Sequence, residues 1–170
     1  MNVNKYTTNQ VVLHWLSAAV ITWAIFSGFY VSLLSPSEEL KSLIGFVNVS
    51  LTTVFIPFFL LRTYYFITLD KPKGSGLSAK NDYIAHIVHW GIYLNIIIAL
   101  ISGVLMMERD INVFHLLHIP QPIDNLVFTG RFNMVHITSC ATLSGLVLLH
   151  VLAVIKHTLT GKNVLKRMSI

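Results

Sequence analysis

Residues 132–155 read FNMVHITSCATLSGLVLLHVLAVI and contain no Asp, Glu, Lys or Arg. At about 1.5 Å per residue, a helix of this length rises about 36 Å, more than the roughly 30 Å hydrocarbon core of a bilayer. Three further stretches of at least 20 residues also lack these charges, and they are 6–37, 42–61 and 83–107. The sequence therefore predicts an all-α, transmembrane four-helix bundle.

The composition supports a membrane protein. Of the 170 residues, 54% are hydrophobic and 11% are charged, whereas soluble domains carry about 25% charged residues. A soluble enzyme and a nucleic-acid-binding protein are therefore excluded. The only cysteine, Cys140, lies inside the last apolar stretch, which excludes a disulfide scaffold. We expect a single domain over residues 1–170, with spans at about 10–34, 43–69, 82–107 and 133–158.

The basic residues predict the orientation. Nine of the 12 Lys and Arg residues lie at the two termini and around the loop between the second and third spans. Cytoplasmic loops are enriched in such residues, so both termini are expected in the cytoplasm. The lipid bilayer is the predicted partner of the spans. Aromatic residues near the span ends are expected in the interfacial belt, and they are Trp15, Tyr64, Tyr65, Trp90 and Tyr93.

Histidines carry most of the chemistry in this sequence. Four of the eight, His14, His89, His136 and His150, lie inside the predicted spans or near their ends. Ionisable residues at membrane depth are costly and usually face the bundle interior. Neutral imidazole is also a common metal ligand, so these four residues are candidate ligands.

His136 and His150 lie 14 residues apart on one predicted helix. At about 100° and 1.5 Å per residue, they share a face within about 40° and are separated by about 21 Å. This geometry suits two stacked haems, each held by one of these histidines and a second from another helix. The alternative is two separate interhelical hydrogen bonds.

His14 lies about one turn inside the first span, at the same membrane side as His150. The two histidines therefore have matching depth on antiparallel helices, as bis-histidine ligation of a b-type haem requires.

Several motifs together resemble the bacterial cytochrome b561 family. They are HWLS at 14–17, LR at 61–62, the pair His136 and His150, and KNVLKRM at 162–168. The resemblance covers essentially the whole chain. It implies a four-helix inner-membrane cytochrome with two b-type haems, which passes electrons between quinone and other donors or acceptors. One family member is similar to a superoxide oxidase that reduces ubiquinone.

The resemblance also implies roles for individual residues. His14 and His150 would ligate the cytoplasmic-side haem, and His136 would ligate the periplasmic-side haem. His89 matches a family histidine beside the haem or a quinone. Arg62 is placed to pair with a haem propionate, with binding to a lipid phosphate as the alternative.

The second haem lacks an expected ligand, because Asn48 occupies the position of the family's helix-2 histidine. Asparagine is not a normal axial ligand, so the sequence is compatible with either one or two haems per chain. His115 and His118, in the loop between the third and fourth spans, are tentative substitutes. The alternative is that these two histidines simply lie at the membrane interface.

The sequence thus predicts a bacterial inner-membrane, b-haem electron carrier, with quinone and a periplasmic electron-transfer protein as candidate partners. Whether it is an oxidoreductase enzyme depends on a donor and acceptor that the sequence does not name. The alternatives are a haem-containing anchor subunit of a dehydrogenase complex and a histidine-lined metal-ion transporter.

Overall fold

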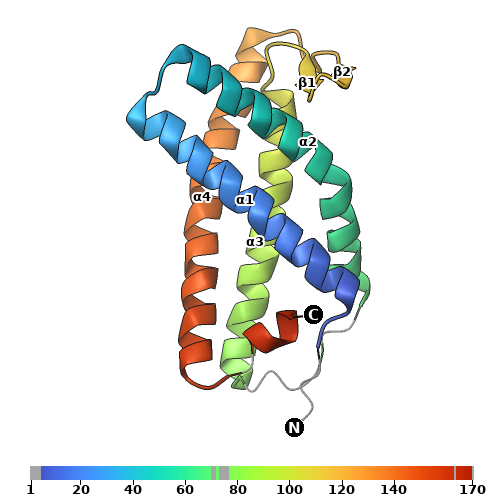
Figure 1. The fold of residues 1–170 in the computed structure, drawn as a ribbon, viewed down its shortest axis with the longest axis vertical. Coiled ribbons are helices and arrows are strands. Elements are labelled where there is room, and N and C mark those ends of the chain that lie inside the picture. The colour runs from blue at the N-terminus through green and yellow to red at the C-terminus, as the bar shows by residue number, and fades with distance from the viewer. Residues whose placement is uncertain (1–4, 70–71, 73–76, 163, 170) are drawn as a thin grey trace.

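The computed structural model describes residues 5–69, 72, 77–162 and 164–169. It contains four long helices, α1 (Thr8–Leu34), α2 (Glu38–Thr68), α3 (Ala79–Leu105) and α4 (Leu126–Leu159). Each is long and apolar enough to cross a membrane. The predicted all-α four-helix bundle is confirmed (Figure 1).

Each helix begins before its predicted span, because a polar residue caps it. Thr7 forms a capping box with Gln10, and the Ser37 and Ser78 side chains accept the backbone N–H groups of Leu40 and Asn81. The largest difference is in α4, which begins at Leu126 rather than near 133. Asn125 caps it by accepting hydrogen bonds from the N–H groups of Val127 and Phe128. Such caps satisfy N–H groups that the helix cannot pair.

The bundle consists of two helix pairs. α1 packs along α2, and α3 packs along α4, whereas α1 and α4 hardly touch at the backbone level. In Figure 1, α3 and α4 run side by side and α1 crosses them obliquely. An apolar cluster fills the interior between the pairs, and its buried members are Val20, Phe55, Phe59, Ile92, Tyr93, Ile96 and Leu143.

The connection between α3 and α4 contains an antiparallel hairpin that the sequence did not predict. Strand β1 (Ile111–Val113) pairs with β2 (Leu117–Ile119) in the register Asn112 opposite His118. The fully buried Ser50 of α2 holds the hairpin, because its hydroxyl donates to the Asn112 carbonyl (3.1 Å) and accepts from the Phe114 N–H (3.0 Å). Leaving such buried groups unpaired would cost about 1–3 kcal/mol, so Ser50 fixes where the hairpin lies.

The two ends of the bundle differ. The terminus end comprises the start of α1, the end of α2, the start of α3 and the end of α4. There a short 3-10 helix, η1 (Leu165–Met168), lies near the start of α1 (Figure 1). The opposite end carries β1 and β2 and is called the hairpin end.

Candidate functional site

Arg62 links α1 to α3 at the terminus end. Its Nη2 donates a hydrogen bond of 3.0 Å to Nδ1 of His14. Its guanidinium also lies 5.2 Å from the centre of the Tyr93 ring, within the range of a cation–π contact. Three helices therefore contribute one side chain each to a polar contact inside the bundle.

His150 and His89 form a second contact at the same end. Their ring centres are 5.2 Å apart, with the planes at 58°. His14 is close enough to both Arg62 and His150 for their charges to act on it, and Arg62 likewise acts on His150. The structure thus brings together four of the predicted site residues, namely His14, His89, His150 and Arg62.

The protonation of His14 follows from its partner. A guanidinium can only donate, so Nδ1 of His14 accepts and the proton of the neutral imidazole lies on Nε2. A haem iron bound through Nε2 needs the opposite tautomer, with the proton on Nδ1. Ligation of iron by Nε2 of His14 would therefore require this hydrogen bond to break, which would free the Arg62 guanidinium for an anion such as a propionate.

The donor set at the terminus end fits a b-type haem, since imidazoles from α1 and α4 are the ligands such a haem takes. The cavity beside His14 has a volume of only about 60 Å³, below the roughly 300 Å³ of typical ligand pockets. Haem would therefore have to separate side chains between α1 and α4, whose backbones hardly approach each other. The cavity is lined by Gln10, His14, Arg62, Tyr65, Phe66, Tyr93 and Met168.

Tyr93 was misassigned by sequence reasoning. It was predicted in the interfacial belt, but it is 7% exposed and stacks on Phe66 with ring centres 4.2 Å apart. The belt prediction is consistent with the exposed rings of Trp15, Tyr64 and Trp90. A tyrosine one turn after His89, on the same helix face, was the signal that could have marked Tyr93 as part of the site.

His136 lies against α3, nearer the hairpin end. Its Nδ1 is 3.0 Å from the Ala99 carbonyl oxygen. A carbonyl only accepts, so Nδ1 carries the proton and Nε2 keeps its lone pair, as an iron ligand requires. Nε2 is 3.5 Å from Sγ of Cys140. A Cβ on Gly103 would lie 3.1 Å from the imidazole, so this glycine lets His136 approach the α3 backbone.

Asn48 has a structural partner on α1. Its Oδ1 accepts a hydrogen bond of 3.0 Å from the hydroxyl of Ser27, which is 6% exposed. The Asn48 side chain therefore ties α2 to α1. Within the described residues, no hydrogen bond or ring contact joins Asn48 to His136.

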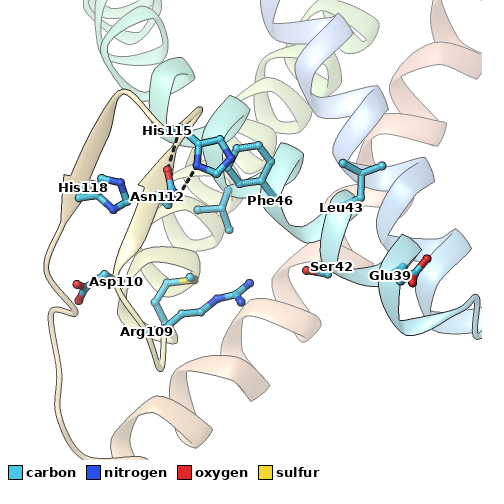
Figure 2. A pocket seen from close by; sticks show the side chains of 11 residues that line it. Glu39, Ser42, Leu43, Phe46, Arg109, Asp110, Asn112, His115 and His118 are labelled. Atoms are coloured by element: carbon cyan, nitrogen blue, oxygen red, sulfur yellow. Dashed lines mark hydrogen bonds between the residues drawn. The ribbon is translucent and has the colours of Figure 1, made fainter.

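The hairpin end has a larger cavity, of about 670 Å³. His115 and His118 both contribute to its lining, between the start of α2 and the hairpin (Figure 2). The remaining lining residues are Glu39, Ser42, Leu43, Phe46, Val49, Met107, Arg109, Asp110 and Asn112.

The two loop histidines are held differently. His115 stacks on Phe46 with ring centres 4.7 Å apart, and Asn112 both accepts from its backbone N–H and donates to its Nδ1, each over 2.9 Å (Figure 2). His118 is exposed, and in the part of the chain described no hydrogen bond or ring contact restrains its side chain. Neither histidine is brought into hydrogen-bond or ring contact with His136 there.

Comparison with known proteins identifies the family. A family model described as prokaryotic cytochrome b561 matches residues 5–169, which is essentially the whole chain. A search of curated proteins gave no significant match.

Proposed function

The chain belongs to the prokaryotic cytochrome b561 family, and from that premise we propose that it exchanges electrons between a b-type haem and the membrane quinone pool. Membership makes it a multi-pass membrane, b-haem electron-transfer protein. Electron exchange with quinone is the part of this function that we propose. A lipid-soluble carrier suits a redox site enclosed by four apolar helices.

His14 and His150 are proposed as the axial ligands of the haem at the terminus end. The observation that carries this is the convergence of His14, His150, His89 and Arg62 from all four helices. The haem would supply reversible one-electron chemistry. The protein would hold it between α1 and α4, keep bulk water away with Tyr93 and Phe66, and offer Arg62 to a propionate.

The quinone proposal predicts rapid electron exchange in both directions. The purified protein is oxidised, mixed anaerobically with a short-chain ubiquinol, and followed by the absorbance of the haem. We expect reduction by quinol, and reoxidation when quinone is added to the dithionite-reduced protein. Dithionite alone gives the full amplitude as the control. Haem that dithionite reduces, but that neither quinol reduces nor quinone reoxidises, would refute the quinone proposal.

The terminus end is proposed to face the cytoplasm. Most of the basic residues lie in the terminal segments and around the connection between α2 and α3. Cytoplasmic segments are enriched in such residues. A reporter fused after Ile170 should therefore be active in the cytoplasm, and one inserted near Gln121 should be active in the periplasm. The reverse pattern would invert the orientation, and it would place the haem of His14 and His150 on the outer side.

An electron-transfer protein outside the membrane is proposed as the second partner. It would approach the hairpin end, where His118 and Arg109 are exposed beside the larger cavity. Stable co-purification of a catalytic subunit would instead favour an anchor function within a dehydrogenase complex.

A further inference from the structure

The segment after α4 folds back onto the start of α1. Nε1 of Trp15 donates a hydrogen bond of 2.9 Å to the Met168 carbonyl, and the Tyr6 N–H donates one of 3.2 Å to the Arg167 carbonyl. Trp15 and Met168 are 153 positions apart in the sequence. They hold the first turns of α1 from outside the bundle.

This contact reaches the candidate haem site. Trp15 follows His14 in the chain, and their rings meet edge to face with centres 5.5 Å apart. Met168 lines the same small cavity as His14 and Arg62. The segment 164–169 therefore covers the site on its outer side and contacts the neighbour of a proposed ligand.

Arg167 is the most buried residue of this segment, at 8% exposure. Its Nη2 donates to the Pro72 carbonyl, and its guanidinium lies 5.6 Å from the centre of the Tyr6 ring. Burial raises the pKa of the Tyr6 phenol above its ordinary value, although the Arg167 charge opposes this. The phenol thus stays neutral and presents a ring to the cation. Arginine is seldom buried unless it is paired, and here the Pro72 carbonyl and the Tyr6 ring are the partners.

We propose that residues 164–169 form a cap that fixes the start of α1 and thereby positions His14, with Arg167 holding the cap in place. Arg167 and Met168 act as positioning residues, through Trp15 and the backbone of α1. Neighbours that orient a metal ligand are typically worth about 10- to 100-fold in affinity. The part of the proposal that concerns haem rests on ligation by His14, whereas the part that concerns α1 does not.

Three variants of the full chain test the cap. Arg167→Ala removes the guanidinium contacts to the Pro72 carbonyl and the Tyr6 ring. A stop codon after Val164 removes the rest of the cap and leaves the sequences of the four helices unchanged. Lys166→Ala is the matched control, because Lys166 lies in the same segment and is exposed. Two measurements are made, namely amide hydrogen exchange of residues 8–15 in the haem-free protein and the rate of haem loss to excess apomyoglobin.

Both cap variants should exchange faster at residues 8–15 and lose haem about tenfold faster, whereas Lys166→Ala should match the wild type. Unchanged exchange in both cap variants would overturn the proposal. Faster exchange with an unchanged rate of haem loss would also overturn it, because the cap would then not act on the ligand. If the wild-type protein binds no haem, the proposed function fails, and the exchange measurement alone decides whether the cap fixes α1.

Discussion

Replacing either His14 or His150 with alanine is expected to remove the low-spin b-type spectrum of the haem at the terminus end. A low-spin iron in such a protein needs both axial imidazoles, so neither residue can compensate for the other. The two histidines come from α1 and α4, the helices that have few direct contacts with each other. Loss of one ligand should therefore also weaken retention of the haem between them.

Haem per chain is measured by the pyridine haemochrome assay, and spin state by absorbance and electron paramagnetic resonance. His157→Ala is the control, because His157 lies on α4 beyond His150 and outside the contact network. Arg62→Ala separates ligation from propionate binding, since Arg62 contacts His14 but is not a proposed ligand. It should weaken haem retention but keep the low-spin signal of the haem that remains. A low-spin spectrum that persists in His14→Ala would show that the ligand has been assigned wrongly.

The sequence predicted the features that depend on charge and periodicity. Four charge-free stretches were enough to predict the four helices, and the spacing of His136 and His150 was enough to place both on one helix. The helices begin before the predicted spans because polar caps determine where they start. The predicted span began at about 133 and left Arg131 outside it, but the cap at Asn125 starts α4 before that residue. Asn125 itself was a visible signal for a helix start.

The hairpin could not be predicted in the same way. Its tip has Phe114 and His115 at positive φ, 48° and 59°, where turns usually carry Gly or Asn. These two residues are held in place by Ser50 and Phe46 of α2. Such tertiary contacts leave no local pattern in the sequence. The contact of Trp15 with Met168 was hidden for the same reason.

We expect one haem per chain, with the position near His136 empty. The Asn48 amide is already bonded to Ser27, so α2 offers no ligand there. Among the loop histidines, His115 accepts a hydrogen bond at Nδ1 from Asn112 and stacks on Phe46. Its proton is therefore on Nε2, and iron binding at Nε2 would require the hydrogen bond from Asn112 to break. His118 has no such restraint among the described residues, which makes it the better of the two substitutes.

The energetic argument favours the same outcome. Ser50 holds the hairpin against α2, so moving a loop histidine to His136 would first break buried hydrogen bonds, at about 1–3 kcal/mol for each group left unpaired. In the described residues, Nδ1 of His136 instead bonds to the Ala99 carbonyl of α3, and Nε2 lies near Sγ of Cys140. These contacts suit a histidine that joins two helices. The Nδ1 hydrogen bond to Ala99 supports the interhelical role, while the lone pair on Nε2 would still allow this imidazole to bind iron.

His136→Ala should therefore leave the haem content at one per chain and the low-spin spectrum unchanged, while it lowers the stability of the packing of α3 on α4. The haemochrome assay and thermal unfolding measure the two effects separately. His118→Ala and His115→Ala should both retain the wild-type haem content. Two haems per chain in the wild type would contradict this expectation. In that case, loss of one haem in both His136→Ala and His118→Ala would identify His118 as the substitute for the family's helix-2 histidine, whose position Asn48 occupies, because the two residues would then share one iron.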